Sequence, residues 1–467
     1  MRSWDAPRVA EAAGATLAGV PAASVEAAVG SDAQPGPVRA AIDSRRLAAG
    51  ELFVGLAGER ADGGEHAAEA LRMGAWGVLV APEHAASASA AASEAGRGGA
   101  VLVHEHPLMS LQALARAWRR ELGAQGTKVV GITGSTGKTS TKDILAALLA
   151  RSMRVVASVE NLNTEIGLPL AVLAAPAGTQ ALVLEMAMRG RGQIAELATI
   201  AEPDVGVIVN VGPVHLELLG SLAAIAAAKA ELIAGLRPGA TIVLPAGEPL
   251  LEPHVRADVE TVTFGVGGDV ALAQASGDGR VLIAAHGRTI ELRPSFAQAH
   301  NLRNLLAAAA AALALGTEPE GPLEVRFSAL RGERLALPGG VVVIDDCYNA
   351  NPMSMRAAID DLTETAPTRR VAVLGDMLEL GPDAPRLHRE IGLYAADAGV
   401  DLMIAVGALA AEMRTEFDGE SYAVADAPAA AELLATLLAD GDTVLVKGSR
   451  GVGLERVAEA LGAARGR

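Results

Sequence analysis

The chain has 467 residues, more than one hydrophobic core usually supports, so two to four domains are expected. Apolar residues make up 51% and charged residues 20%, a balance typical of globular proteins that excludes a disordered chain. The net charge of −16 would repel a phosphate backbone, and an aromatic content of 2% leaves few side chains for stacking on bases. We therefore expect no nucleic-acid partner, and any nucleotide would be a small molecule.

The cysteine content and the lengths of the apolar runs indicate in which cellular compartment the protein is expected. The one cysteine, Cys347, cannot form an intramolecular disulfide and fits a reducing environment. Asp5 and Glu11 fall where a signal peptide would need an apolar core. The longest apolar run, Leu305 to Leu315, is well short of the ~20 residues that cross a bilayer. The sequence predicts a cytoplasmic protein with no membrane span.

Residues 1–107 form the first expected domain, a small α/β unit. The stretches "ELFVGL" and "WGVLVA" are typical of short strands, and "GEHAAEALRMGA" between them of a helix. The stretch "PLMSLQALARAWRREL" then has helical apolar spacing and leads into the strand "KVVGITG". The first domain boundary is therefore expected near Pro107.

Residues 108–330 form the second expected domain. Continuous apolar runs alternate with helical stretches, which indicates buried parallel strands in a doubly wound sheet; the runs are "VVGIT", "RVVAS", "ALVLEM", "VGVIVN" and "TIVLP". The strands "VETVTFG", "DVALAQA", "RVLIAAH" and "TIELRP" follow and suggest an antiparallel addition. The helix "NLRNLLAAAAAALALG" closes this domain.

Residues 331–467 repeat the alternation of strands and helices in a third, smaller domain. Its strands are expected in "GVVVIDDC", "RRVAVLGDM", "DLMIAVG" and "DTVLVKGS". The pattern predicts a Rossmann-like domain, but no G-x-G-x-x-G follows its first strand, so dinucleotide binding is not predicted. The overall expectation is an α/β protein of three domains.

The stretch "GITGSTGKTS" resembles a phosphate-binding loop between a strand and a helix. Its first glycine is Gly131, one residue earlier than the pattern G-x-x-x-x-G-K-[ST] requires. Backbone N–H groups of residues 134–138 would point at phosphate oxygens, Lys138 would neutralise the β- and γ-phosphates, and the Thr139 hydroxyl would bind Mg²⁺. The alternative is a strand-to-helix turn capped by its own hydroxyls. The expected nucleotide-binding residues here are Gly134, Ser135, Thr136, Gly137, Lys138, Thr139 and Ser140.

Candidate metal ligands stand at the ends of later strands. Glu185 ends "ALVLEM" and His215 follows "VGVIVNVGPVH", at the sheet edge where ligands of open α/β proteins collect. With Thr139 they make an oxygen- and imidazole-rich set that suits one or two Mg²⁺ ions, although each alone also fits a surface or loop role. Lys229 lies on an alanine-rich helix, where a snorkelling lysine is the simplest interpretation.

Two further polar groups have both structural and functional interpretations. Asn301 and Asn304 stand three residues apart near the start of a helix, where amides cap the helix or hold an adenine edge. The stretch "VVVIDDCYNANPMSMRAAI" places several polar side chains directly after a buried-type strand, which strand-exit turn chemistry alone would explain. Its polar residues are Asp345, Asp346, Tyr348, Asn349 and Asn351.

Together these motifs resemble the Mur ligase family, ATP-dependent amide ligases of peptidoglycan precursor synthesis. The family's phosphate loop has the form G-x-x-G-x-x-G-K-T, which accounts for Gly131. "DDCYNANPMSM", "LGDMLELG", "VKGSR" and the N-terminal "DSRRLAAGELFVGLAGERADGGEHAAEAL" are similar to the members that add D-alanyl-D-alanine to UDP-N-acetylmuramoyl-tripeptide. The resemblance runs from about Asp43 to Arg450. It implies ATP, two Mg²⁺ ions and these two small-molecule substrates, and we expect a monomer.

The resemblance also implies roles for individual residues. Lys138, His215 and Lys229 would be catalytic, with Lys229 carbamylated so that it presents oxygen ligands. Metal would be held by Thr139, Glu185, His215 and Lys229. The implied nucleotide contacts beyond the loop are Asn301, Asn304, Arg334 and Asp346. The implied substrate contacts are Ser44 and Arg45 on the uridine side, Asn161, Asn163 and Thr164 on the muramoyl side, and Tyr348, Asn349 and Asn351 in the third domain.

Four positions depart from the family pattern. Thr164 stands where asparagine is common, Cys347 where serine is common, and Ala187 where glycine is usual. Gln193 replaces a glutamate and removes a charge, so it is left outside the expected catalytic set.

The resemblance implies that the tripeptide carboxylate attacks ATP, and that the amine of D-alanyl-D-alanine then attacks the resulting acyl phosphate. The first domain (1–107) would bind the UDP-muramoyl substrate, the second (108–330) ATP, and the third (331–467) the dipeptide. One alternative is a sibling ligase that adds the third residue, or folylpolyglutamate synthase. A nucleotide-switched P-loop binding protein is the alternative from another class.

Overall fold

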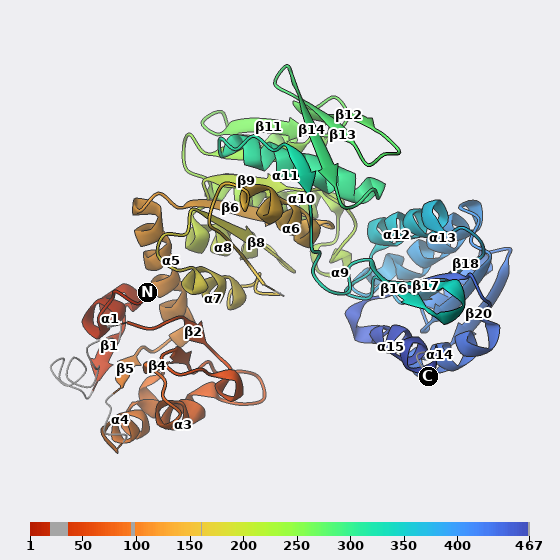
Figure 1. The fold of residues 1–467 in the computed structure, drawn as a ribbon. Coiled ribbons are helices and arrows are strands. Elements are labelled where there is room, and N and C mark those ends of the chain that lie inside the picture. Colours follow the sequence, from red (N-terminus) through yellow and green to blue (C-terminus); the bar gives the residue numbers. More distant parts are fainter. Residues whose placement is uncertain (19–35, 95–98, 160, 466–467) are drawn as a thin grey trace.

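The structure is a computed structural model that describes residues 1–18, 36–94, 99–159 and 161–465. Three sheets organise it, and Figure 1 shows them as an N-terminal unit (residues 1–103), a central unit (107–330) and a C-terminal unit (331–465). The N-terminal and C-terminal units lie on separate sides of the central unit, and both adjoin it (Figure 1). The α/β class with three layered units is confirmed.

The N-terminal unit contains a five-stranded sheet of order β1-β5-β4-β3-β2. Strands β2 to β5 pair in parallel, and β1 runs antiparallel to β5. Its strands are β1 Thr16–Ala18, β2 Ala40–Ala41, β3 Leu52–Val54, β4 Gly77–Val80 and β5 Ala100–Val103, and its α-helices include α1 Ala6–Ala13, α3 Ala67–Arg72 and α4 Ala85–Glu94.

Helix α5, Pro107–Ala124, joins the N-terminal unit to the central unit. Trp118 on this helix is buried and packs edge-on against Trp4, with ring centroids 5.3 Å apart. Its indole N–H donates to the carbonyl oxygen of Ala175 at 2.9 Å, which satisfies the polar end of the ring. One hydrophobic core runs from the N-terminal unit through α5 into the central helices. These two units therefore share a core.

The central sheet has ten strands in the order β15-β14-β13-β12-β11-β10-β9-β6-β8-β7. The part from β7 to β11 is parallel, and β12, β13 and β14 pair antiparallel. The antiparallel addition expected from the sequence is therefore smaller than predicted, because β11 ("ETVTF") pairs in parallel with β10. The strands are β6 Lys128–Thr133, β7 Val155–Ala157, β8 Ala181–Glu185, β9 Val205–Ile208, β10 Thr241–Pro245, β11 Glu260–Phe264, β12 Val270–Ala275, β13 Val281–Ala285, β14 Arg288–Pro294 and β15 Gly321–Leu323.

Helices cover both faces of the parallel part of the sheet. Since successive residues of a strand point to opposite faces, neighbouring residues of one strand belong to different cores. In β6, Val129 packs with α5, α7, α8 and α10, whereas Val130 and Ile132 pack with α6 and α11. This double burial explains the unbroken apolar runs in the sequence. The helices are α6 Lys138–Leu149, α7 Gly167–Ala174, α8 Gln193–Ala201, α9 Leu216–Leu219, α10 Leu222–Gly235 and α11 Ala299–Ala314.

The C-terminal unit has a six-stranded sheet of order β16-β17-β21-β18-β19-β20. Only β16 is antiparallel to its neighbour, so the unit is a mostly parallel, Rossmann-like sheet. The strands are β16 Glu333–Leu337, β17 Val341–Asp345, β18 Arg370–Gly375, β19 Leu402–Val406, β20 Glu420–Val424 and β21 Thr443–Lys447; the helices are α12 Pro352–Thr365, α13 Ala384–Asp397, α14 Ala427–Leu437 and α15 Glu455–Arg465.

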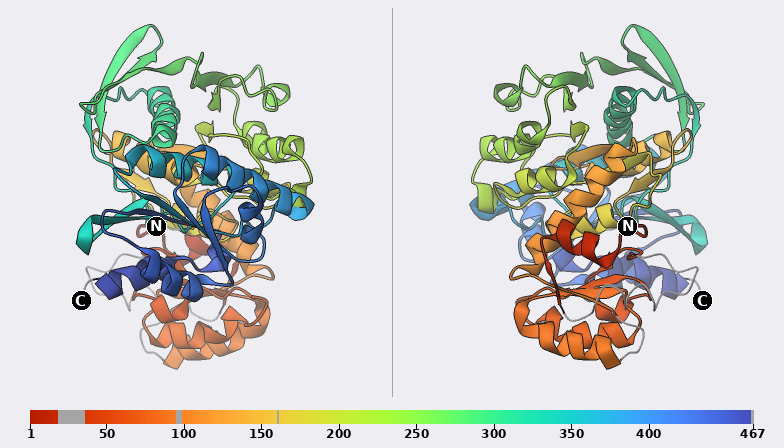
Figure 2. Two further views of the ribbon diagram at one scale, coloured as in Figure 1. Left: turned by 90° about the vertical axis from the view of Figure 1, so that its right-hand side faces the viewer. Right: turned by 90° about the vertical axis from the view of Figure 1, so that its left-hand side faces the viewer.

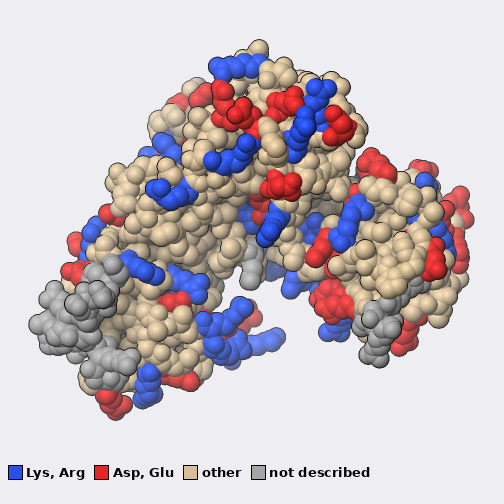
Figure 3. Space-filling view, in the orientation of Figure 1, with Lys and Arg blue, Asp and Glu red and all other residues tan. Residues whose placement is uncertain are grey.

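The C-terminal unit touches the central unit beside the carboxyl end of β9. A Cβ atom added at Gly212 would lie 1.9 Å from the Met353 sulfur, so the start of α12 is packed directly on this loop. The side views of Figure 2 place the β12–β14 strands at the opposite end of the molecule from the N-terminal unit. In Figure 3 a deep indentation opens between the N-terminal and C-terminal units, and Lys and Arg side chains border it. Among the described residues, no helix is long and apolar enough to cross a membrane.

Candidate active site

A cleft of about 1240 Å³ lies between the central and C-terminal units. It gathers residues that are more than 300 positions apart in the sequence, from the phosphate loop to the exit of β21. The expected site residues that line it are Ser135, Thr136, Gly137, Lys138, Thr139, Ser140, Asn161, Asn163, Thr164, Glu185, His215, Asn301, Asn304, Arg334, Asp346, Tyr348, Asn349 and Asn351. The cleft lining does not include Gly134, Lys229, Ser44 or Arg45.

The phosphate loop connects β6 to α6 and requires glycine where it turns. Gly137 has φ +74° and starts the helix, and a Cβ atom there would lie 2.4 Å from the Asn304 side-chain oxygen. Glycine at 137 therefore lets α11 approach the loop closely. No side chain caps α6 at this end, so its first backbone N–H groups are available to an anion.

Asn210 holds the other half of the loop, and the sequence did not single it out. Its side-chain oxygen accepts the backbone N–H groups of Ser135 at 3.0 Å and Thr136 at 2.9 Å. Its side-chain nitrogen donates to the Thr136 hydroxyl at 2.9 Å. The expectation that these two N–H groups face phosphate is thus wrong for this structure, because Asn210 already accepts both. The loop donors left for an anion belong to residues 137–140.

Lys138 curls back over the loop, and its Nζ donates to the carbonyl oxygen of Gly134 at 2.9 Å. Burial lowers the pKa of Lys138, Glu185 opposes that effect, and Arg331 adds to it. The lysine therefore lies in a site that is short of negative charge, as expected for a group that pairs with a polyphosphate.

Thr139 and Glu185 are in direct contact at the cleft floor. The Thr139 hydroxyl donates to a Glu185 carboxylate oxygen at 2.8 Å, and the other carboxylate oxygen accepts from the Asn163 amide at 3.0 Å. Glu185 is only 3% exposed, so these bonds fix its orientation. Asn163, on the loop expected to hold the muramoyl substrate, therefore donates a hydrogen bond to the Glu185 carboxylate.

His215 lines the same cleft as Thr139 and stands at the start of α9. Its Nδ1 hydrogen-bonds the carboxylate of Glu379, which belongs to the C-terminal unit. Burial lowers the pKa of His215, the Glu379 carboxylate raises it, and the charges of Lys138 and Lys229 lower it further. The two lysines therefore lie close enough to act on the imidazole.

Lys229 is 1% exposed on α10. Burial lowers its pKa well below the ordinary value, and the charge of Lys138 lowers it further. The snorkelling interpretation is wrong, because the ammonium end does not reach solvent. Burial therefore favours the uncharged amine of Lys229 over its ammonium form.

Helix α11 presents a polar face to the cleft. The Asn304 amide donates to the Asn301 side-chain oxygen at 3.3 Å, and both residues are buried. Gln298 stands one turn further from the phosphate loop, and its buried side-chain oxygen has no partner among the described residues. This face extends about 9 Å from the loop, at 1.5 Å per residue.

Two arginines at the start of the C-terminal unit behave differently. Arg334 lines the cleft but pairs with Asp361 at 2.7 Å, and it also donates to Thr365 at 3.0 Å. Arg331 reaches the phosphate loop, where it donates to the Thr139 hydroxyl at 3.0 Å and lies 3.9 Å from the centre of the Tyr348 ring. The sequence reasoning missed Arg331, although it precedes β16 by only two residues.

Asp346 is tied to a buried lysine. Lys447, which is 2% exposed at the end of β21, donates to the Asp346 carboxylate at 2.6 Å and to the Asn349 carbonyl oxygen at 3.0 Å. Asn351 caps α12, where its side chain and Ser354 form a capping box. The polar residues after β17 therefore include a helix cap, as the structural interpretation of the sequence expected. Asp346, Asn349 and Asn351 also line the cleft.

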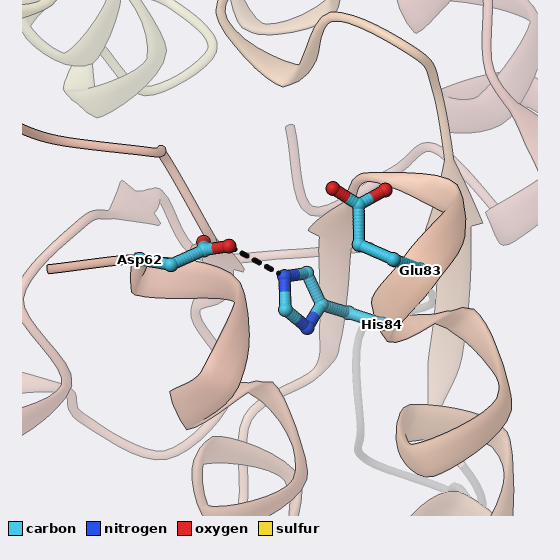
Figure 4. Close-up of side chains that lie close together, drawn as sticks. All are labelled: Asp62, Glu83 and His84. Carbon is cyan, nitrogen blue, oxygen red and sulfur yellow. Dashed lines mark hydrogen bonds and ion pairs between the residues drawn. The ribbon is translucent and has the colours of Figure 1, made fainter.

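Ser44 and Arg45 lie in the N-terminal unit, in a short turn capped by Asp43. The Arg45 guanidinium pairs with Asp43 at 2.9 Å, which lowers the pKa of that carboxyl to about 2. Figure 4 shows a second polar group in this unit, where the His84 Nε2 and an Asp62 oxygen are 2.8 Å apart and Glu83 is nearby. Asp62 also accepts the Gly64 N–H at 2.8 Å, so this group braces a loop.

The sheets and the cleft define a three-unit α/β protein with a phosphate-loop nucleotide site between two of its units. The description "Mur ligase middle domain" matches residues 132–312, and "Mur ligase, glutamate ligase domain" matches residues 330–450. This chain belongs to the Mur ligase family.

The similar proteins cover nearly the whole chain. The UDP-N-acetylmuramoyl-tripeptide--D-alanyl-D-alanine ligase of Mycobacterium tuberculosis is 39% identical, over 90% of this chain and 91% of that protein. The ligase of the same name from Bacillus subtilis is 35% identical, over 90% and 92%. The structure of MurF from Acinetobacter baumannii superposes with a TM-score of 0.84 at 27% identity, over 98% of both chains. MurF ligase from Thermotoga maritima in complex with ADP gives a TM-score of 0.75 at 31% identity, over 91% and 96%.

Proposed function

We propose that this chain is an ATP-dependent amide ligase that joins D-alanyl-D-alanine to UDP-N-acetylmuramoyl-tripeptide, releasing ADP and phosphate. The observation that carries the proposal is that one cleft brings the phosphate loop, the Thr139–Glu185 pair and the polar exit of β17 face to face. The names of relatives that align with 90% of the chain support the substrates, and the ADP complex of a similar ligase supports the nucleotide. The enzyme would act in the cytoplasm as a monomer.

The reaction has two steps. The tripeptide carboxylate attacks the γ-phosphorus of ATP, ADP leaves, and an acyl phosphate forms. The amine of D-alanyl-D-alanine then attacks the acyl carbon and loses a proton, and phosphate leaves with its electron pair. Both steps bring anions together, so positive charge in a closed cleft is the main requirement. Lys138 and the N–H groups of residues 137–140 would supply it at the phosphates.

The donor set at the cleft floor fits Mg²⁺. Thr139 and Glu185 offer a hydroxyl and a carboxylate 2.8 Å apart, and His215 adds an imidazole nitrogen. Lys229 fits only as a carbamate, because Mg²⁺ prefers oxygen ligands and neither the ammonium nor the amine offers one. Thr139, Glu185, His215 and carbamylated Lys229 would therefore hold two Mg²⁺ ions. Bound there, the ions would offset the charge that develops on the transferred phosphoryl group.

The nucleotide would run from the phosphate loop along α11. Asn301 and Asn304 would face the adenine side, and the unpartnered oxygen of Gln298 is an acceptor for an exocyclic amine. Ser135, Thr136 and Ser140 complete the loop around Gly134 and Gly137. Asp346 and Arg334 would act from the C-terminal unit, and we add Arg331 because its guanidinium already donates to the Thr139 hydroxyl.

The UDP-muramoyl substrate would extend from the first domain into the cleft, and the dipeptide would bind on the side of the third domain. The first domain (1–107) would bind the uridine nucleotide through Ser44 and Arg45, and Asn161, Asn163 and Thr164 of the central domain (108–330) would face the muramoyl peptide. Tyr348, Asn349 and Asn351 of the third domain (331–467) would face D-alanyl-D-alanine.

Product identification by mass spectrometry tests the assignment against the sibling ligases. The enzyme is incubated with ATP, Mg²⁺ and each pair of acceptor and donor: tripeptide with D-alanyl-D-alanine, and muramoyl dipeptide with meso-diaminopimelate or lysine. We expect a new mass only for the pentapeptide product. A product from the muramoyl dipeptide would instead assign the chain to the enzymes that add the third residue.

A further inference from the structure

The loop that follows β18 in the C-terminal unit rests on α9 of the central unit. The carbonyl oxygen of Glu379 accepts the backbone N–H of Glu217 at 3.3 Å. A Cβ atom at Gly381 would lie 3.1 Å from the Glu217 Cα atom, so the two backbones are in close contact. With Met353 packed on Gly212, the C-terminal unit contacts the central unit on both sides of His215.

The two side chains that meet between these contacts both have unusual backbones. His215 has φ +54° and Glu379 has φ +62°, the left-handed region that residues with a Cβ atom rarely adopt. Such conformations persist only where the surroundings impose them, and they cluster at functional sites. Here the two conformations bring the imidazole of His215 and the carboxylate of Glu379, which belong to different units, into hydrogen-bond contact.

The contact fixes the tautomer of His215. A carboxylate only accepts hydrogen bonds, so the Nδ1 atom that faces Glu379 must carry a proton. The lone pair of the neutral ring is then on Nε2, the nitrogen that Glu379 does not bind. A carboxylate behind a metal-binding histidine orients the ring and strengthens it as a ligand.

The segment that carries His215 is also tied to the phosphate loop. Asn210 accepts the Ser135 and Thr136 N–H groups, and the Gly212 N–H donates to the Ser135 hydroxyl at 2.8 Å. Residues 210–217 therefore connect the nucleotide loop on one side with the C-terminal unit on the other.

We propose that Glu379 is a positioning residue that the C-terminal unit supplies to the cation site of the central unit. It holds His215 with Nε2 available to a divalent cation, so the site is complete only while the C-terminal unit is docked. The cation would then bind weakly in an undocked enzyme, which limits phosphoryl transfer before the units close. This inference rests on the proposed function only for the identity of the cation.

Manganese binding tests the proposal without turnover. Mn²⁺ replaces Mg²⁺ as the probe, and free Mn²⁺ is measured by electron paramagnetic resonance with the full chain and a non-hydrolysable ATP analogue. We expect Glu379→Ala to weaken Mn²⁺ binding about 10- to 100-fold. Glu379→Gln should recover part of the loss, because its amide oxygen still accepts from Nδ1. Adding Glu379→Ala to His215→Ala should cause no further loss, since Glu379 acts through the ring.

Asp383→Asn is the matched control, because Asp383 is on the same loop, is exposed and, within the described part of the chain, pairs with Arg386 alone at 3.4 Å. It should bind Mn²⁺ like the wild type. Unchanged Mn²⁺ affinity in Glu379→Ala, or equal losses in the alanine and glutamine variants, would overturn the proposal. A chain that binds Mn²⁺ as expected but forms no amide product would overturn the proposed function and leave this inference intact.

Discussion

The guanidinium of Arg331 donates a hydrogen bond to the Thr139 hydroxyl at 3.0 Å, across the boundary between the C-terminal and central units. Its Nε atom is buried and has no partner among the described residues. The same guanidinium lies over the Tyr348 ring. An arginine with spare donors that already touches the expected Mg²⁺ ligand is placed to meet a γ-phosphate.

Replacing Arg331 should impair catalysis more than replacing Arg334. Arg331→Ala removes a charge that faces the phosphate loop, so kcat/KM for ligation should fall about 100-fold or more. Arg334 already pairs with Asp361, so Arg334→Ala should lower kcat/KM less than Arg331→Ala and should also lower the free energy of unfolding. Phosphate release under saturating substrates measures the first effect and urea denaturation the second. Arg356→Ala, on the nearby α12, is the control. Equal kinetic losses at positions 331 and 334 would contradict this distinction.

Asn210→Ala should weaken nucleotide binding although Asn210 need not touch the nucleotide. The substitution leaves the Thr136 N–H without its acceptor, at a cost of about 1–3 kcal/mol, and leaves the Ser135 N–H only the Asn210 backbone carbonyl oxygen at 3.2 Å. Part of that cost appears as loosening of the loop, so ADP affinity should fall about tenfold or more. Isothermal titration calorimetry with ADP measures it, and Thr199→Ala on α8 is the control. An unchanged ADP affinity would show that the loop does not depend on Asn210.

Lys229→Met should abolish ligation and stabilise the fold. A buried lysine is costly, and a methionine of similar length removes that cost, so the free energy of unfolding should rise by about 1 kcal/mol. Lys229→Ala should regain some ligation when short carboxylic acids are added, because they can replace the carbamate oxygens. If Lys229→Met retains the wild-type rate, Lys229 has no part in the reaction.

The lowered pKa of Lys229 also gives a pH dependence with a definite sign. Between that lowered pKa and the ordinary 10.5, the unfolded chain binds a proton at Lys229 that the folded chain lacks. The free energy of unfolding of the wild type therefore rises with pH across this window, whereas Lys229→Met lacks this contribution. The stability difference between the two proteins should narrow as pH increases. Urea denaturation of both proteins at several pH values measures the difference, in carbonate-free buffer so that Lys229 is an unmodified amine. A gap that widens with pH would contradict the assignment.

Removing Asp346 should lower the free energy of unfolding more than removing Lys447, its partner in the ion pair. The Lys447 side chain is 2% exposed and the Asp346 side chain 22%. Asp346→Ala leaves a buried ammonium without its counter-charge and should cost about 3 kcal/mol of unfolding free energy. Lys447→Met leaves a carboxylate that water can reach, so the cost should be nearer 1 kcal/mol. Guanidinium denaturation of the two variants checks the order, and the reverse order would show that the pair is not held as described.

Local patterns made part of this site predictable. The phosphate loop could be predicted because its glycines, Lys138 and Thr139 are contiguous, and Glu185 and His215 because parallel strands bring their carboxyl ends to one edge. The double burial of the central sheet followed from its unbroken apolar runs.

Long-range contacts made the rest unpredictable. Asn210 bonds a loop some 75 residues earlier, and nothing in "VIVNVGPVH" distinguishes it from a turn asparagine. Arg331 and Arg334 both line the cleft, and nothing in the sequence shows that Arg334 pairs with Asp361 while Arg331 reaches Thr139. Lys229 looked like a snorkelling residue because helix composition does not reveal how deeply α10 is packed.

Transfer of ¹⁸O from the tripeptide tests the central claim most directly. The terminal carboxylate of UDP-N-acetylmuramoyl-tripeptide is labelled with ¹⁸O, the reaction is run with ATP, Mg²⁺ and D-alanyl-D-alanine, and the released phosphate is examined by mass spectrometry. If the carboxylate is phosphorylated and the amine then displaces phosphate, one ¹⁸O atom must appear in each phosphate released with product. Unlabelled phosphate, released at the same rate without D-alanyl-D-alanine, would instead show simple ATP hydrolysis and contradict the ligase mechanism.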